Sequence, residues 1–409
     1  MYLAWTELGP GATFWLLGLV PAIIFGTQIV VLRRHGLRLA AVALPAVLCG
    51  LVLLPYVTFR PQSLSWILLS VLLVVLIGLR PDRRWWLVAL FPGFVLWANL
   101  HGFYVVGLGV LAVYAAFTLV GRTAMAPARG WVAAALVAAI AATMLTPAGP
   151  AGLLYPLRYL EPGDWGLTNI REWQSPDFHD VAQWPLLALV VAVGATAGRR
   201  SPGWLALLAW IGIAGSLLSL RVAPVAAVLA LPSLAFGLDS WLAQRTQRKS
   251  NGRASEPLAR RLLEIGLAAA VVVTALVAVL PPDVEAAAQA TIERRFPVAA
   301  TAWLAENQPR AHVYNAYLWG GWLIWELTDR GGRNFVDGRN DMFSQQILDD
   351  YAAIQEADPG WESILAGYGP TAILVQPDAR LVHGPAQLAG WCEVSRDEVA
   401  VLLVPHCPD

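Results

Sequence analysis

Long apolar blocks alternate with short polar segments along the first 280 residues. Ten such blocks can be distinguished, at residues 12–32, 38–58, 63–79, 85–100, 103–121, 131–146, 183–198, 203–220, 224–238 and 262–280. An α-helix rises about 1.5 Å per residue, so about 20 apolar residues cross a hydrocarbon core about 30 Å thick. The pattern predicts an α-helical polytopic membrane unit over residues 1–281, with about ten transmembrane helices.

The pattern changes after residue 281. Apolar positions have helical spacing at 297–307, and further helices are expected at 319–327, 342–353 and 360–368. Short β-rich runs bounded by turn residues occupy 311–314, 334–336, 371–375 and 399–404. Strands that alternate with helices predict a small α/β layer domain over residues 282–409.

Composition supports a membrane protein. The chain is 57% hydrophobic and only 14% charged, with a mean hydropathy of +0.57, whereas soluble domains are about a quarter charged. A net charge of zero gives no indication of nucleic acid. The repeated apolar blocks make the lipid bilayer of the cell membrane the expected partner. Cys392 and Cys407 lie near the C-terminus, on what look like neighbouring terminal strands, but the sequence alone leaves a bridge between them open.

The basic residues predict the orientation. Alternate polar segments, at 33–38, 80–84, 122–129, 199–200 and 245–261, hold sixteen Lys and Arg, whereas the opposite segments hold four. Short cytoplasmic loops carry the excess of Lys and Arg. Loop 239–261 is therefore expected in the cytoplasm. The N-terminus, loop 146–182 and the C-terminal domain are expected on the extracytoplasmic side.

Distinctive polar residues fall at the ends of apolar blocks that this orientation places outside. They are Arg60, Gln62, Asn99, His101 and Arg221. A polar group at membrane depth is costly and tends to face a cavity or a partner. The sequence therefore predicts a polar cleft at the outer boundary, covered by the C-terminal domain.

Each of these residues also has a simpler interpretation. Arg60 and Arg221 either reach lipid headgroups or bind an anionic phosphate. His101 either caps a helix hairpin or acts as a base or ligand. Asn99 either bonds to a turn backbone or lines the cleft.

Loop 146–182 carries the candidate carboxylates. Glu172 next to Trp173 is the first candidate, because an aromatic neighbour changes a carboxyl environment and offers a surface for stacking a sugar. Glu161, Asp164 and Asp177 are weaker candidates, a solvated loop acid is the alternative, and Tyr155 is a candidate substrate contact. Asp177, His179 and Asp180 leave a divalent cation open as a cofactor, at loose spacing.

Two polar turns stand out in the C-terminal domain. Trp319 lies in a strand–helix junction, and Asp337 and Arg339 follow a strand, where open α/β sheets bind ligands. A packed junction and an Asp-Gly turn are the structural alternatives. The sequence contains no G-x-x-x-x-G-K-[ST], H-E-x-x-H, paired C-x-x-C or G-x-S-x-G motif, which argues against an ATP-driven transporter or a zinc protease.

Several motifs together resemble a known family. They are Arg60-Pro61-Gln62, Trp97-Ala98-Asn99-Leu100-His101-Gly102, Glu172-Trp173-Gln174-Ser175-Pro176, Tyr317-Leu318-Trp319-Gly320-Gly321 and Val336-Asp337-Gly338-Arg339. Over nearly its whole length the chain resembles a largely uncharacterised bacterial family of polytopic proteins. That family looks like the GT-C-type glycosyltransferases, which use polyprenyl-phosphate-linked sugars.

The resemblance implies transfer of a sugar from a lipid-phosphate donor at the outer face. It also implies a catalytic acid in a first external loop, whereas this sequence begins at what resembles the second span. We therefore expect either that the first helix and loop are missing here, or that another carboxylate, Glu172 first, acts as the base. Arg60, Arg221 and His101 would hold the phosphate. The alternative is a non-catalytic scaffold or lipid-binding subunit whose outer domain recruits a partner.

Overall fold

A computed structural model describes residues 2–58, 60–154, 170–196, 201–250, 283–339, 342–383 and 390–405. The chain divides into two compact units. The first comprises Met1–Pro162 and Ile170–Pro282, and the second Gly163–Asn169 and Asp283–Asp409.

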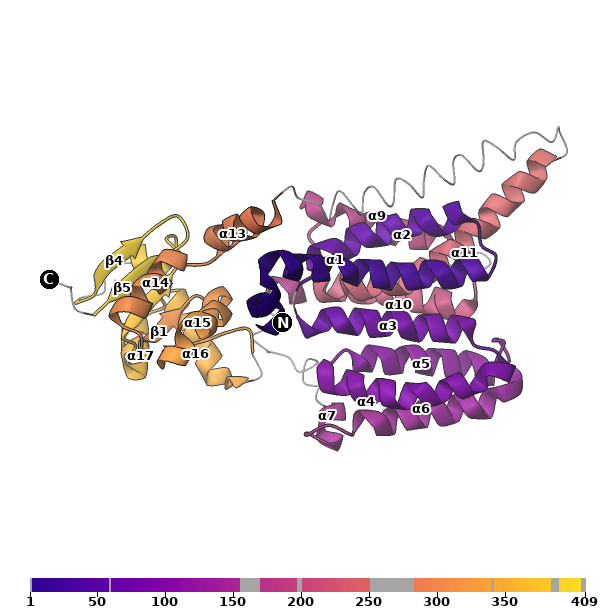
Figure 1. Cartoon of the computed structure of the whole chain (residues 1–409), viewed down its shortest axis with the longest axis horizontal. Coiled ribbons are helices and arrows are strands. Elements are labelled where there is room, and N and C mark those ends of the chain that lie inside the picture. The colour runs from indigo at the N-terminus through magenta and orange to yellow at the C-terminus, as the bar shows by residue number, and fades with distance from the viewer. Residues whose placement is uncertain are drawn as a thin grey trace. The chain divides into compact units, whose positions relative to one another are not determined.

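Helices make up the first unit (Figure 1). Its α-helices are α1 (Tyr2–Arg34), α2 (Leu39–Leu53), α3 (Pro61–Gly78), α4 (Leu90–Leu100), α5 (Tyr104–Leu119), α6 (Arg129–Thr143), α7 (Pro150–Leu154), α9 (Trp184–Thr196), α10 (Gly203–Leu218) and α11 (Ala223–Ser250). Short 3₁₀ segments join them at η1 (Leu54–Tyr56), η2 (Pro81–Ala89), η3 (Ala126–Ala128), η5 (Arg171–Trp173), η6 (Val181–Gln183) and η7 (Leu220–Val222).

Five described stretches are long and apolar enough to cross a membrane: Leu16–Arg34, Leu39–Tyr56, Pro61–Gly78, Ala126–Thr143 and Leu220–Arg245. Three shorter apolar helices are Tyr104–Leu119, Val181–Thr196 and Gly203–Leu218. The predicted span at 262–280 lies outside the described residues, and the first part of the predicted span 85–100 belongs to η2. The expectation of ten crossing helices is therefore not confirmed, although helices coincide with the first nine blocks.

One boundary differs clearly from the prediction. Helix α11 continues to Ser250, although a polar loop was expected from residue 239. Residues 240–250 are polar but contain neither Gly nor Pro, and Gln, Arg, Lys and Leu are good helix formers. Polarity marked where the apolar block ends, but the helix continues past that point.

Close helix packing forms the core of the first unit. Helix α11 is buried without interruption from Ala223 to Ala235 and packs against α2 and α10. A Cβ at Gly212 would lie 2.9 Å from the Cα of Ala226, so the missing side chain lets α10 approach α11 closely. Gln28 adds a polar contact, because its Nε2 donates to Ser70 Oγ and to the Val228 carbonyl, both at 3.2 Å.

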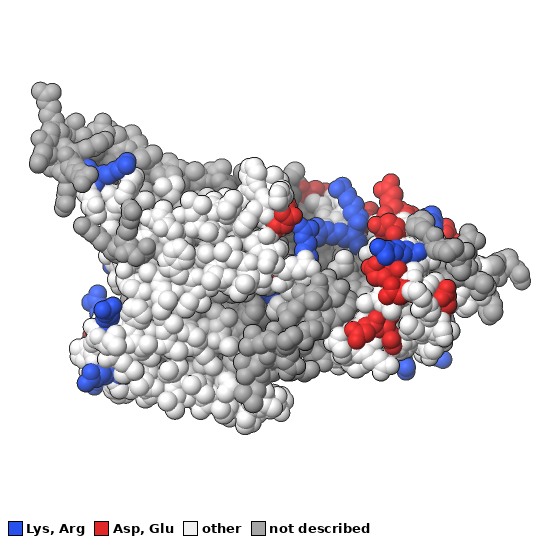
Figure 2. All heavy atoms as spheres, turned by 180° about the vertical axis from the view of Figure 1, so that it is seen from behind, with Lys and Arg blue, Asp and Glu red and all other residues white. Residues whose placement is uncertain are grey.

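The charged side chains are unevenly distributed over this unit. Figure 2 shows Lys and Arg gathered at one end of the helices, while the helix flanks seen in this view are almost uncharged. At the junction of α1 and α2, Arg38 forms an ion pair of 3.0 Å with Asp239 of α11. The uncharged flanks suit a lipid environment, which supports a membrane protein.

The second unit is built around a five-stranded sheet (Figure 1). Its strands, β1 (His312–Asn315), β2 (Arg333–Asn334), β3 (Ala372–Val375), β4 (Cys392–Arg396) and β5 (Val401–Val404), lie in the order β2-β1-β3-β5-β4. Strand β1 is parallel to β2 and β3, whereas β5 is antiparallel to β3 and β4. The helices are α13 (Val284–Arg295), α14 (Val298–Asn307), α15 (Gly320–Leu327), α16 (Gln345–Gln355), α17 (Trp361–Tyr368) and α18 (Arg380–His383).

The α/β prediction for the C-terminal part agrees with this sheet. Strands β1, β3 and β5 coincide with predicted runs, and helices α14 to α17 fall close to the predicted segments. Helix α13 was not predicted, because its sequence, VEAAAQATIERR, is rich in alanine and shows no apolar stripe. Cys392 is disulfide-bonded, and Cys407 lies outside the described residues.

Candidate functional site

The loop that carries Glu172 is fixed by hydrogen bonds to the chain that follows α10. The amide of Leu220 donates to the Gln174 carbonyl at 2.9 Å. Ser219 Oγ donates to the Glu172 carbonyl at 3.2 Å. These bonds pair the short segments η5 and η7, so that residues around 172 and 221 lie side by side at one end of the helices.

Glu172 is the centre of an ion-pair cluster. Its Oε1 accepts from Arg221 Nη1 at 2.8 Å, and its Oε2 accepts from Arg60 Nη1 at 3.5 Å. Arg60 precedes Pro61 at the start of α3, and its side chain is 61% exposed, whereas that of Arg221 is 22% exposed. The structure thus brings together three of the residues singled out in the sequence, from three separate segments.

Aromatic rings surround the guanidinium of Arg221. It lies 4.5 Å from the ring centroid of Trp173 and 5.8 Å from that of Phe103. Within the described part of the chain, its buried Nε has no hydrogen-bond partner. Arg221 therefore presents an unused N–H donor, while a face of Trp173, predicted as a surface for sugar stacking, is occupied by the arginine.

The turn between α4 and α5 completes this part of the site. His101 Nδ1 accepts from the Phe103 amide at 3.2 Å, so the proton of the neutral ring lies on Nε2. Burial, together with the positive charge of Arg221, lowers the pKa of His101 to about 4. Asn99 Nδ2 donates to the carbonyls of Val95 and Leu145 at 2.9 and 2.8 Å, as the backbone-bonding interpretation predicted.

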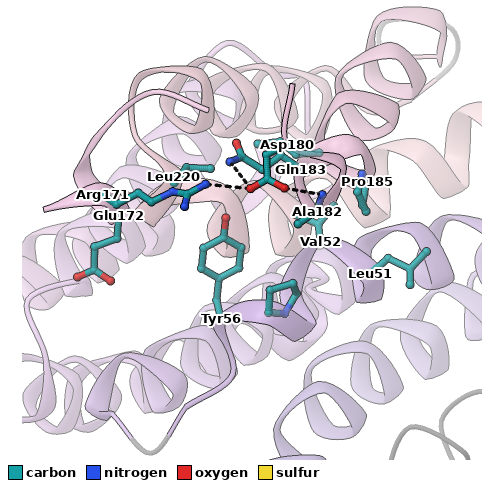
Figure 3. A pocket seen from close by; sticks show the side chains of 12 residues that line it. Leu51, Val52, Tyr56, Arg171, Glu172, Asp180, Ala182, Gln183, Pro185 and Leu220 are labelled. Carbon is teal, nitrogen blue, oxygen red and sulfur yellow. Dashed lines mark hydrogen bonds and ion pairs between the residues drawn. The ribbon is translucent and has the colours of Figure 1, made fainter. Parts of the chain in front are cut away.

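A cavity of about 340 Å³ lies beside η5, with Arg171, Glu172 and Leu220 in its wall. Arg171 and Asp180 form an ion pair of 2.9 Å in its wall, and the hydroxyl of Tyr56 points toward them (Figure 3). The Glu172 side chain, although it also lines the cavity, points away from this pair. The remaining wall is mostly apolar and comes from the end of α2, the start of α9 and η7: Leu51, Val52, Pro55, Pro185, Leu186 and Leu220.

The other loop acids have local partners. Asp177 Oδ1 accepts from His179 Nδ1 at 2.9 Å and from the His179 amide at 3.0 Å. These bonds lower the pKa of Asp177, which is exposed. Asp180 pairs with Arg171 instead. In the described ranges, no three His, Cys, Asp or Glu side chains are arranged to hold a metal ion.

Gln62 is buried in the first turn of α3. Tyr155, Glu161 and Asp164 lie outside the described residues.

In the second unit, the Trp319 and Asp337 motifs pack against each other. A Cβ on Gly320 would overlap the Val336 carbonyl oxygen and the Asp337 side chain, so this position requires glycine. Trp319 is 3% exposed and donates from Nε1 to the Arg295 carbonyl at 3.0 Å. Trp319 is therefore part of the core.

Asp337 is held in place within this junction. Its carboxylate accepts from Arg339 Nε and Nη2 at 2.8 and 2.7 Å, and from Asn334 Nδ2 at 3.0 Å. Burial alone would raise the pKa of Asp337, but the hydrogen bonds from Arg339 and Asn334 outweigh it and lower the pKa. This geometry favours the structural interpretation of the Asp-Gly turn.

Three residues of the site were not identified from the sequence. Phe103 and Tyr56 look like ordinary helix-end aromatics, and Gln183 like a polar residue before a span. A signal existed for Tyr56, which lies near the end of the apolar block 38–58, four positions before Arg60. No local pattern distinguishes Phe103 or Gln183.

Apolar helices that carry a charged cluster at one end, followed by an α/β unit, define a polytopic membrane protein with an appended α/β domain. No protein-family model matches the chain, and no curated protein sequence matches it. Among solved structures, it is similar to the crystal structure of ArnT from Cupriavidus metallidurans bound to undecaprenyl phosphate. That match has a TM-score of 0.49 and 18% sequence identity, and it covers 97% of this chain and 85% of that chain.

Proposed function

We propose that this chain is a membrane glycosyltransferase-like protein that acts on a lipid-phosphate-linked sugar. The observation that carries the proposal is the arrangement of Arg60 and Arg221 about Glu172 at the end of apolar helices. Arg221 has a buried Nε–H without a partner among the described residues. Guanidinium groups form strong charge-assisted hydrogen bonds with phosphate, and the cluster of two arginines and one carboxylate has a net positive charge.

In the proposed reaction, a phosphate between the arginines releases the Glu172 carboxylate. The acceptor hydroxyl then transfers its proton to Glu172 while its oxygen bonds to the anomeric carbon of the sugar. The bond from that carbon to the phosphate oxygen breaks, and the electron pair stays on the phosphate. Arg60 and Arg221 stabilise the charge that develops there. His101, neutral near pH 7, would add one N–H donor from Nε2.

The proposal places the Glu172 end of the helices outside the cytoplasm. The excess of Lys and Arg in the segments at the opposite end supports this orientation. A non-catalytic lipid-binding subunit would use the same arginines and differ only in lacking turnover.

An assay of sugar transfer by the full chain in lipid nanodiscs tests the proposal. A panel of polyprenyl-phosphate-linked hexoses is supplied, and release of polyprenyl phosphate is measured together with its binding. Glu172→Gln should abolish release while the lipid phosphate still binds, and Arg221→Gln should weaken binding. Arg80→Gln, an exposed arginine in the segment between α3 and η2, is the matched control. Binding without release by the unmodified chain would favour the lipid-binding subunit, and full activity of Glu172→Gln would exclude Glu172 as the base.

A further inference from the structure

The cavity beside Tyr56 differs in charge from the cluster around Glu172. Its own ion pair, Arg171 with Asp180, is neutral, and the nearby Glu172 is neutralised by Arg60 and Arg221. An anionic headgroup therefore gains little at the Arg171–Asp180 pair compared with the two arginines that pair with Glu172. An uncharged group that exchanges hydrogen bonds suits this wall better.

The polar side of the cavity offers both donors and acceptors. Asp180 Oδ1 accepts from the Ala182 amide at 3.0 Å, and its Oδ2 accepts from Arg171 at 2.9 Å and, weakly, from Gln183 Nε2 at 3.5 Å. Gln183 Oε1 accepts from the Asp177 amide at 2.9 Å, so within the described residues the second lone pairs of the Asp180 carboxylate and one N–H of Gln183 are left for a ligand. The Tyr56 hydroxyl points toward the Arg171–Asp180 pair, and it makes no hydrogen bond to the described residues (Figure 3). A carboxylate, an amide and a phenol within one wall are the groups that bind sugar and polyol hydroxyls.

The opposite side of the cavity is apolar and lies next to exposed apolar side chains of α2 and α9. Leu51 of α2 is 46% exposed, and the neighbouring Leu187 of α9 is 40% exposed. The cavity thus has an apolar half beside the lipid-facing flanks of two helices and a polar half at their ends. That division matches an amphiphile with one chain and an uncharged headgroup.

We propose that this cavity binds the hydroxyl-bearing headgroup of a membrane amphiphile, with Tyr56, Asp180 and Gln183 as its hydrogen-bonding residues. The role of this amphiphile as the acceptor of the transferred sugar rests on the proposed function, whereas binding of the headgroup does not. As acceptor, its hydroxyl would approach the sugar from the Arg171 side of η5, while the phosphate stays on the Arg221 side.

Two probes that share a dodecyl tail but differ in headgroup distinguish the two sites. Dodecyl maltoside carries an uncharged hydroxylated head, and dodecyl phosphate carries an anionic one. Each is titrated against the full chain in lauryldimethylamine oxide, a detergent with neither hydroxyl nor phosphate groups, and the bound fraction is measured by native mass spectrometry. Tyr56→Phe removes only the hydroxyl, which makes no hydrogen bond to the described residues, so the variant keeps the fold. Asp180→Asn removes the charged acceptor.

We expect each variant to weaken maltoside binding by about five- to tenfold, the contribution of a single hydrogen bond, and to leave dodecyl phosphate binding unchanged. Arg221→Gln should have the reverse effect. Unchanged maltoside binding in both Tyr56→Phe and Asp180→Asn, or competition of the two probes for one site, would overturn the inference. Failure of the proposed function gives different results. Either Arg221→Gln leaves dodecyl phosphate binding unaltered, or the lipid phosphate binds without turnover, and in both cases the maltoside result stands by itself.

Discussion

Arg221 donates to Glu172 at 2.8 Å across 49 positions of sequence, and this contact joins the loop before α9 to the turn after α10. Trp173, the residue next to Glu172, lies against the same guanidinium. The arginine is therefore held both by charge and by stacking. This double contact fixes the orientation of the Arg221 guanidinium.

Arg221→Lys should be a damaging substitution although it keeps the charge. A lysine ammonium cannot form a planar fork or stack on Trp173 in the same way. We expect binding of polyprenyl phosphate to weaken by about 10- to 100-fold, since charge-assisted hydrogen bonds contribute about 1.5–3 kcal/mol. Arg60→Lys, at a more exposed side chain, should have a smaller effect. Equal losses in the two variants, measured by native mass spectrometry in nanodiscs, would contradict this ranking.

Gly320→Ala should destabilise the second unit. The new Cβ would overlap the Val336 carbonyl and lie 2.6 Å from the Asp337 Cα, so backbone must move at a cost of about 1–3 kcal/mol. The matched control is Gly321→Ala, because a Cβ there has no atom within 4 Å. Differential scanning fluorimetry of both variants should show a lower melting temperature for Gly320→Ala alone. Equal melting temperatures would show that the turn can shift freely.

Asp337→Asn should change how stability depends on acid pH. The folded pKa of Asp337 is lowered from the ordinary value of 3.8, so its ionised form contributes stability above that value. This contribution is lost as the pH falls through the folded pKa. Thermal unfolding at pH 7 and pH 3 should therefore show a smaller difference for the variant than for the unmodified chain. An identical difference in both proteins would remove Asp337 from this role.

His101→Gln should change how stability depends on pH in a higher pH range than Asp337→Asn. The pKa of His101 is lowered to about 4 from an ordinary value of 6.5, so between these values the unfolded chain binds a proton that the folded chain does not. Stability therefore falls as the pH drops from about 7 toward 4. The variant should lose less melting temperature between pH 7.5 and pH 5. A larger loss in the variant would contradict the lowered pKa.

Cysteine labelling in intact cells tests the predicted orientation. Cys49 is buried and Cys392 is disulfide-bonded, so neither should react with a membrane-impermeant maleimide. Glu306→Cys in the second unit should be labelled from outside, and Arg80→Cys only after the cells are permeabilised. The reverse result would place the Glu172 cluster on the cytoplasmic face.

The sequence by itself determined the membrane character and most of the elements. Apolar blocks, proline at the start of α3, and alternating strand and helix signals are local features, and the backbone responds to them locally. The same local chemistry singled out Arg60, Glu172 and Arg221. It also misplaced the end of the α11 block and did not predict α13, where polarity and helix propensity diverge.

Only the tertiary structure decided which of these residues meet. Arg60 and Glu172 are 112 positions apart, and the Asp337 turn packs closely against Gly320. Such contacts depend on how the helices and strands pack as a whole, and no single window of sequence contains that information. The meeting of Tyr56 with Arg171 and Asp180 in one cavity wall follows from the same long-range packing.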